Sequence, residues 1–232
     1  MCGDRMKEKN IYIVMGVLVL CLCLGGILFF SKDFKSNPKE DKASFYSDIS
    51  INDEAVLELY QNIMASDELS FNYDLLKNNV ITNSYMIGSG MAKALRDNVK
   101  TPISSSEINL YIRKIFGDVT VHYEDILLNG QKYSFDSDKD EYVIKEMDDY
   151  SKTDKILSKL VSAKKSTTEY ILTIKMVVVN NANNNVYSDI DCTNIIDNRE
   201  NINIDDYLDE ASTYNYHFTF NGETFVLTSV TK

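Results

Sequence analysis

The residues best suited to metal chemistry are three aspartates at alternate positions, Asp136, Asp138 and Asp140. This spacing opens like an EF-hand loop, in which carboxylates at alternate positions bind calcium. The motif then departs from that pattern, because Glu141 stands where the loop needs glycine and Met147 stands where a bidentate glutamate should close the site. The pattern therefore favours a solvated hairpin turn over a calcium site.

Acid–base catalysis has few candidates in this chain. The two histidines, His122 and His217, are each predicted on the polar face of a strand. No H-E-x-x-H, C-x-x-C or G-x-S-x-G motif is present, so zinc hydrolysis and the serine-hydrolase elbow lack their defining residues. A triad assembled from distant residues stays an open alternative. We predict no catalytic, metal-binding or cofactor-binding residues and no cofactor.

The stretch Gly88-Ser89-Gly90 resembles a phosphate-binding loop at first sight. Such loops follow a strand and continue as G-x-G-x-x-G or end in Gly-Lys-Ser/Thr, and this stretch does neither. We therefore predict close helix packing through the small residues Gly88 and Ala92.

Cysteine usage limits covalent chemistry. Cys2, Cys21 and Cys23 lie in or before a long apolar segment, which leaves Cys192 alone in the remainder of the chain. No disulfide can form within that remainder. Strand alternation places Cys192 on an inward face with Ile190, so we interpret it as a buried small hydrophobe rather than a nucleophile.

The long apolar segment is residues 11–30, with the sequence IYIVMGVLVLCLCLGGILFF. It contains no charge, and at about 1.5 Å per residue it would cross roughly the 30 Å hydrocarbon core of a bilayer as a helix. A cleaved signal peptide would end in a small-x-small site, whereas FFSK follows here, and no small residue precedes Cys21 or Cys23 as in a lipoprotein. We predict a transmembrane helix that makes the lipid bilayer a partner through residues 11–30.

Basic residues flank this segment on both sides, so their count alone does not choose its orientation. The ten residues before it are too few for a folded domain, whereas the part after it is domain-sized. This asymmetry is typical of an uncleaved signal anchor in a single-pass protein of the cell membrane. The predicted organisation is a cytoplasmic head (1–10), a transmembrane helix (11–30), a polar stalk (31–50) and one extracytoplasmic α+β domain (51–232).

Charge argues against a nucleic-acid partner. Residues 1–42 carry seven basic and five acidic side chains, which leaves 17 basic and 30 acidic side chains and a formal net charge of −13 for residues 43–232. Phosphate backbones repel such a domain, because counterion release favours only cationic proteins. The abundance of Asn, Lys, Ile, Asp and Tyr is typical of a bacterium with an AT-rich genome.

Three amphipathic helices are predicted where apolar residues recur every three or four positions. The third is the best defined, because Ser104 and Glu107 form a capping box and Gly117 supplies a left-handed stop. Asn83 is the expected cap of the second helix. The expected ranges are 52–65, 84–98 and 104–116.

Antiparallel strands are expected after Gly117. Asn129-Gly130 signals a two-residue hairpin turn, which pairs Leu128 with Gln131 and Ile126 with Tyr133. Residues 119–124 alternate like a strand, but they fall out of phase with this register unless a bulge lies near Glu124-Asp125. Residues 142–144 are expected to extend this sheet as a further strand after an acidic turn.

The later strands follow the same alternation. Residues 156–163 have helical spacing, yet the short link to the next strand favours a strand, and the choice stays open. The strand 169–179 is apolar on both faces and therefore central. Further expectations are a strand at 186–192, a short acidic helix at 204–211, and a closing hairpin with an Asn221-Gly222 turn that sets Phe225 opposite Phe218 and Leu227 opposite Tyr216.

A resemblance rests on structural motifs: the Ile115-Phe116-Gly117 helix end, the Tyr207-Leu208 segment and the closing Tyr-x-Tyr-x-Phe…Asn-Gly…Phe-x-Leu-x-Ser-Val hairpin. They resemble uncharacterised single-span surface proteins of low-GC Gram-positive bacteria. The layout of helices followed by a hairpinned antiparallel sheet is similar to NTF2-like or cystatin-like cone folds. This resemblance implies about three helices packed on one strongly curved, cone-like antiparallel sheet, sometimes around a ligand pocket.

The sequence favours a membrane-tethered, extracytoplasmic, non-enzymatic module that binds a protein or cell-envelope partner. The alternatives are an enzyme with an NTF2-like pocket, with His122 or a buried carboxylate as its base, and a structural subunit of a cell-envelope complex. A concave apolar cavity without titratable side chains would count against the enzyme.

Overall fold

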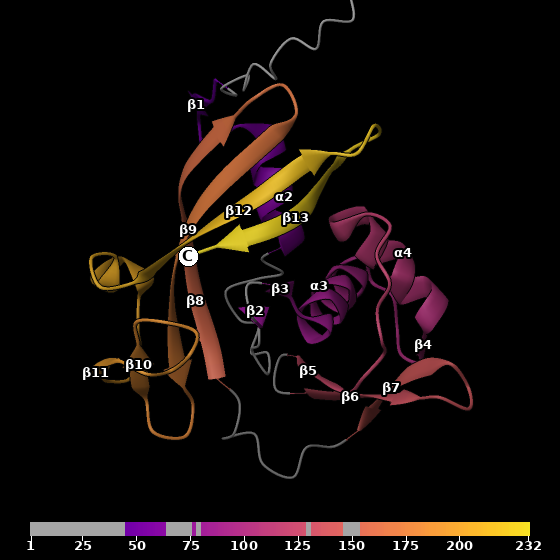
Figure 1. Ribbon diagram of the computed structural model, residues 1–232. Coiled ribbons are helices and arrows are strands. Elements are labelled where there is room, and N and C mark those ends of the chain that lie inside the picture. The colour runs from indigo at the N-terminus through magenta and orange to yellow at the C-terminus, as the bar shows by residue number, and fades with distance from the viewer. Residues whose placement is uncertain (1–44, 64–75, 78–79, 129–130, 146–153) are drawn as a thin grey trace, which may run out of the picture. The chain divides into compact units, whose positions relative to one another are not determined.

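The computed structural model describes residues 45–63, 76–77, 80–128, 131–145 and 154–232 (Figure 1). The chain divides into two compact units, and the unit described below is Tyr46–Lys232. The predicted head, transmembrane helix and most of the stalk lie outside the described residues, as do Met147 and the Asn129-Gly130 turn. In the described part of the chain, no helix is long and apolar enough to span a bilayer.

The three helices are α2 (Glu54–Ile63), α3 (Asn83–Arg96) and α4 (Ser105–Phe116), close to their predicted ranges. The Ser104 hydroxyl accepts a hydrogen bond from the Glu107 N–H at 3.2 Å, and Gly117 ends α4 with φ +75°, as predicted. The cap of α3 differs from the prediction: Thr82, rather than Asn83, accepts the N–H of Tyr85.

The largest sheet has seven antiparallel strands around β9 (Glu169–Asn180), which confirms the predicted central strand. β8 (Asp154–Lys165) pairs with one edge of β9, so the segment 156–163 is a strand. The other edge of β9 is shared, because β12 pairs with its first part and β10 with its end. The remaining bounds are β1 (Ser47–Ile49), β10 (Asn185–Tyr187), β11 (Ile195–Asn198), β12 (Ser212–Phe220) and β13 (Phe225–Thr231).

A four-stranded sheet in the order β4-β7-β6-β5 contains the first hairpin. Leu128 pairs with Gln131 and Ile126 with Tyr133, which confirms the predicted register, and β7 extends the sheet as expected. A separate two-stranded sheet joins β2 to β3. The bounds are β2 (Leu76–Lys77), β3 (Val80–Ile81), β4 (Ile103–Ser104), β5 (Ile126–Leu128), β6 (Gln131–Asp136) and β7 (Glu141–Lys145).

The segment 119–124 is not a strand, contrary to the prediction. Strand pairing stops at Ile126 because the carboxylate of Asp125 takes the place of a main-chain partner. Its Oδ1 accepts the N–H of Phe135 at 2.9 Å, and its Oδ2 accepts hydrogen bonds from Ser134 and from Lys132, the latter at 2.9 Å. Since residues 119–124 pair with no strand, the bulge expected near Glu124-Asp125 does not form.

We expect the Asp125 carboxylate to stabilise the fold above acidic pH. Burial alone raises the pKa of Asp125, but hydrogen bonds from Lys132, Phe135 and Ser134 outweigh it and lower the pKa below its usual value. A carboxyl group with a lowered folded-state pKa contributes stability above its unfolded pKa, and that stability is lost as the pH falls through the folded value.

Asp125→Asn should therefore lower the free energy of unfolding by about 0.5–1.5 kcal/mol at pH 7, and the difference should shrink below about pH 4. Urea unfolding at both pH values measures this. Asp118→Asn is the control, because that side chain is 90% exposed and its ion pair with Arg113 lies at the surface. An equal loss at pH 7 and pH 3 would contradict the ionic role of Asp125.

The closing hairpin forms with a register two residues from the predicted one. Phe220 pairs with Phe225 and Phe218 pairs with Leu227. The loop is longer than a two-residue turn, because the Asn221 side chain accepts the N–H groups of Glu223 and Thr224 at 3.0 and 2.9 Å. A side chain that binds its own loop in this way competes with the shorter turn.

Two further segments are shorter than predicted. The strand expected at 186–192 ends at Tyr187, and the chain then turns, with Cys192 in the left-handed region at φ +52°. The acidic segment expected as a helix at 204–211 forms the 3₁₀ helix η2 (Ile204–Tyr207).

The fold is α+β, with its strands in separate antiparallel sheets rather than in the single cone-like sheet that was expected. Figure 1 shows α3 and α4 between the seven-stranded sheet and the four-stranded sheet, where α3 contacts β5 and α4 contacts β13. Apolar side chains of all three helices and both sheets share one core. Its fully buried members include Ile87, Met91, Ile112, Tyr142, Tyr216 and Phe218.

Candidate functional site

The three alternate aspartates form the predicted turn, between β6 and β7. Asp136 accepts the N–H of Asp138 at 3.1 Å, and Asp140 accepts the hydroxyl of Ser105 at 2.6 Å while its backbone is left-handed at φ +56°. These carboxylates therefore serve the turn and the start of α4. Within the described ranges, no group of three or more His, Cys, Asp and Glu side chains is arranged to hold a metal ion.

The two histidines have different surroundings. His122 lies outside any strand, contrary to the prediction. Its backbone N–H donates to Oδ1 of Asn83 at 3.5 Å. His217 lies on the half-exposed face of β12, as predicted. Its Nδ1 is 2.8 Å from Oε1 of Glu169, and its Nε2 is 3.4 Å from the hydroxyl of Thr231. This order of hydroxyl, imidazole and carboxylate is that of a catalytic triad.

The stretch Gly88-Ser89-Gly90 lies inside α3 and is buried, which confirms close helix packing. Gly88 and Ala92 are both buried, and Gly90 makes a close contact with α4. A methyl group at Gly90 would lie 2.7 Å from Cγ1 of Ile112 and 3.3 Å from its backbone nitrogen. The glycine therefore lets α3 approach α4.

Cys192 is half-buried against the main core rather than fully buried. Burial and the negative charges of Asp154, Asp189 and Asp191 raise the pKa of its thiol to about 11. Only the thiolate is a strong nucleophile, so the thiol is inert near neutral pH.

Iodoacetamide at pH 7 should accordingly modify Cys192 at least about tenfold more slowly than it modifies free cysteine. Peptide mass mapping at timed intervals measures the rate for this residue alone. The rate should rise to that of an ordinary cysteine in denaturing urea, where the burial is lost. Rapid modification of the folded protein would contradict the raised pKa.

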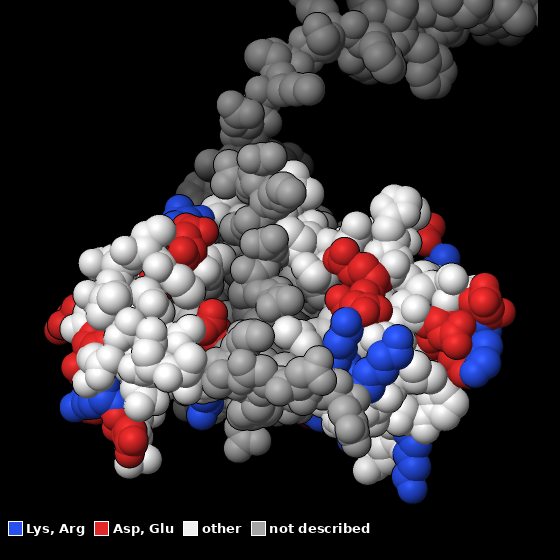
Figure 2. Space-filling model, turned by 90° about the horizontal axis from the view of Figure 1, so that it is seen from below, with Lys and Arg blue, Asp and Glu red and all other residues white. Residues whose placement is uncertain are grey.

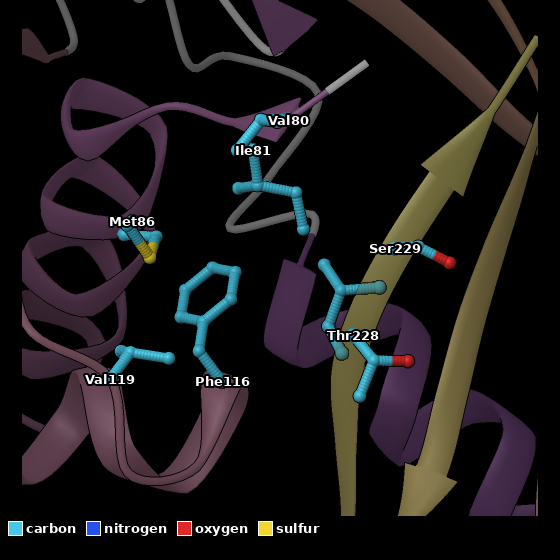
Figure 3. A pocket seen from close by; sticks show the side chains of 8 residues that line it. Val80, Ile81, Met86, Phe116, Val119, Thr228 and Ser229 are labelled. Carbon is cyan, nitrogen blue, oxygen red and sulfur yellow. The ribbon is translucent and has the colours of Figure 1, made fainter.

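An apolar groove of about 420 Å³ lies between β3, α3, α4 and β13 (Figure 3). Figure 3 shows Met86, Phe116 and Val119 on one side of the groove, with Thr228 and Ser229 on the β13 side. The described residues that line it are Val80, Ile81, Met86, Phe116, Val119, Leu227, Thr228 and Ser229.

Part of the lining of this groove is buried, and part of it is open to solvent. Phe116 and Leu227 are almost fully buried, but Val80 is 65% exposed. The eight lining residues include no acidic, basic, histidine, cysteine or tyrosine side chain. The groove can therefore exclude water from an apolar group, but these eight side chains offer no general acid, base or metal ligand.

A second, polar cavity of about 470 Å³ lies beside β8, β9 and β11. Its most basic group, the Arg199 guanidinium, is already engaged, 2.8 Å from Asp206 and 2.6 Å from the Tyr207 hydroxyl. That cation therefore holds η2 against β11. The described residues that line it are Lys155, Leu157, Val179, Asn181, Asn184, Arg199, Glu200, Asn201 and Ile202.

No pattern in the sequence predicts the apolar groove. Phe116 was predicted as part of a helix stripe, Val119 as part of a strand, and Leu227 as a core residue of the last hairpin. None of these patterns predicts that residues 80–86, 116–119 and 227–229 leave a space between them.

No protein-family model matches this chain, and neither a curated protein nor a solved structure matches it. The resemblance to single-span surface proteins and to NTF2-like or cystatin-like folds therefore stays a prediction, and function has to be argued from the groove.

Proposed function

We propose that the domain of residues 51–232 is a non-enzymatic binding module, held outside the cytoplasm by a transmembrane anchor at residues 11–30. Its ligand is an apolar group of a protein or cell-envelope partner, which enters the groove between β3, α3, α4 and β13. The observation that carries this proposal is the apolar lining of that groove.

The size of the groove suits a group as large as one or two apolar side chains. Burying one such side chain contributes about 1.5–3 kcal/mol. That energy is too small for tight binding by itself, so the partner must make further contacts around the rim. Figure 2 shows acidic and basic side chains interspersed on the face seen there, where a nucleic-acid partner would call for a continuous basic surface.

The enzyme alternative lacks support from the groove, because none of the described residues that line it has a titratable side chain. Glu169, His217 and Thr231, which are arranged in the order of a triad, line neither of the two cavities described above. Neither of these two cavities can therefore position an acyl group for attack by this triad. The alternative of a structural subunit predicts co-purification with partners in a fixed stoichiometry after mild detergent extraction.

Binding is tested with residues 43–232 and the neutral probe N-phenyl-1-naphthylamine, whose fluorescence rises in apolar surroundings. We expect saturable binding that Val80→Asp weakens at least about tenfold, because a charge at the rim would have to be desolvated. Leu110→Asp is the matched control, since Leu110 is 60% exposed on α4 and does not line the groove.

Each variant should first show cooperative unfolding like that of the parent. If the probe does not bind, or if both variants weaken binding equally, the groove is not the site and the proposal fails. The location is tested separately. Protease added to intact spheroplasts should remove the domain, and its protection would refute an extracytoplasmic position.

A further inference from the structure

Glu169, His217 and Thr231 belong to three neighbouring strands of the seven-stranded sheet, β9, β12 and β13 (Figure 1). β12 is the middle strand, in which Thr219 pairs with Glu169 on one side and Asn215 pairs with Thr231 on the other. His217 lies midway between Thr219 and Asn215, so Glu169 and Thr231 are its diagonal neighbours on one face of the sheet. The register of the sheet therefore brings the three side chains together.

The hydrogen bonds of His217 define which of its ring nitrogens is a base. Nδ1 lies 2.8 Å from Oε1 of Glu169. An ionised carboxylate can only accept a hydrogen bond, so in the neutral imidazole Nδ1 carries the proton and Nε2 is an acceptor. Nε2 lies 3.4 Å from the hydroxyl of Thr231, which can donate to it. The imidazole is thus placed to take the proton of that hydroxyl as a general base.

The carboxylate of Glu169 is held in place from its other side. Its second oxygen, Oε2, accepts a hydrogen bond from the hydroxyl of Tyr46. The side chains of Glu169 and His217 are each only 23% exposed, whereas Thr231 is an exposed residue. A reagent in solution can therefore reach the hydroxyl, while the base beside it is oriented by partly buried groups.

We propose that Thr231 is an acyl-acceptor site, at which His217 acts as the base and Glu169 positions that base. The substrate class is an activated acyl compound, which is an ester or a thioester. Oγ1 of Thr231 forms a bond to the acyl carbon, and the bond from that carbon to the leaving oxygen or sulfur breaks. The hydroxyl proton passes through Nε2 of His217 to the leaving group, so the products are an ester of Thr231 and a free alcohol or thiol.

This inference goes beyond the proposed function, because it does not involve the groove. Neither of the two cavities described above is lined by these three residues, so neither can hold an acyl donor for repeated turnover. We therefore expect a single covalent modification of the domain rather than a catalytic cycle.

Thr228 supplies a matched control hydroxyl in the same molecule. It is exposed on β13, as Thr231 is. Its hydroxyl lies 3.0 Å from that of Thr219 and donates to the backbone carbonyl of His217 at 3.1 Å. Neither of these partners is a general base, so Thr228 reports the reactivity of an exposed threonine that has no imidazole to activate it.

The test treats the full chain, in a mild detergent at about pH 8, with p-nitrophenyl acetate, because an ordinary imidazole is neutral at that pH. Tandem mass spectrometry of peptides taken at timed intervals gives the acetylation rate of each threonine. Thr231 should be acetylated at least about tenfold faster than Thr228, since a positioned base accelerates such reactions by roughly 10²–10⁴-fold. His217→Gln should lower the Thr231 rate to that of Thr228 and leave the Thr228 rate unchanged.

Glu169→Gln tests the positioning role separately. In this variant the Thr231 rate should fall at least about tenfold, because the imidazole is no longer held in the tautomer that leaves Nε2 free to accept. Nitrogen NMR of histidine-labelled protein reads this tautomer directly. The proton of His217 should lie on Nδ1 in the parent and be shared with Nε2 in the variant, a change that a merely structural role of Glu169 would not produce.

Equal acetylation of Thr231 and Thr228 in the parent, or a Thr231 rate that survives His217→Gln, overturns the proposal. The comparison of the two threonines needs no variant, so it stands even where a variant fails to fold. Release of more than one equivalent of p-nitrophenol that Thr231→Val abolishes would overturn the single modification and favour the enzyme alternative. The naphthylamine measurement is independent of these outcomes, since none of the three residues lines the groove.

Discussion

Replacing Tyr142 by alanine is expected to lower the free energy of unfolding by about 3–5 kcal/mol, the largest single effect that we predict. Tyr142 on β7 is fully buried. Its ring lies 5.2 Å from that of Phe135 and 6.2 Å from that of Tyr123, between ring centroids. The alanine variant loses this packing and leaves a cavity between the four-stranded sheet and the segment before β5.

Tyr142→Phe separates the ring from its hydroxyl. The hydroxyl donates a hydrogen bond to the carbonyl of Glu124 at 3.0 Å, so its loss should cost about 0.5–1.5 kcal/mol. Urea unfolding at pH 7, followed by circular dichroism, measures both variants. A loss below about 1 kcal/mol for the alanine variant would mean that this aromatic cluster is not part of the cooperative core.

The second large effect is expected for Gly90→Ala, which should destabilise the protein by about 1–3 kcal/mol. Helix propensity alone predicts the opposite, a gain of about 1 kcal/mol for alanine in a helix interior. Packing outweighs propensity here, because the added methyl group would lie 2.7 Å from Cγ1 of Ile112. The contact involves a carbon in the middle of a buried side chain, so α3 and α4 would have to move apart.

A double-mutant cycle with Ile112→Ala isolates this contact. Ile112 is fully buried, so its truncation alone should cost about 2–5 kcal/mol. The double variant should lose less than the sum of the two single losses, since the truncation makes room for the new methyl group. If Gly90→Ala stabilises the protein, the two helices do not approach as closely as described.

The sequence alone was sufficient where the signal is local. The bounds of α4 follow from the Ser104 cap and the Gly117 stop, both of which act within one helical turn. The Leu128–Gln131 register follows from a two-residue turn that determines its own flanking pairs. The central place of β9 follows from its apolar character on both faces.

Side-chain hydrogen bonds to the backbone explain why two predicted elements form differently. Residues 119–124 alternate like a strand, but the side chain of Asp125 occupies the backbone donor of β6 that a longer strand would use. The closing hairpin contains the residues of a tight turn, yet the Asn221 side chain holds a wider loop. In both cases the hydrogen bonds of one polar side chain determine the local backbone structure, and the sequence does not show which partners that side chain will take.

The sequence by itself determined the composition of the chain, the uncharged apolar segment at 11–30, the helices and the local hairpin register, because each depends on neighbours a few residues apart. Only the tertiary structure decided how the strands divide into sheets and where the groove lies. The groove exists because the end of α4, the short strand β3 and the edge of β13 meet without filling the space between them. The periodic pattern of apolar residues does not predict a contact between segments that are more than 100 residues apart, such as α4 and β13.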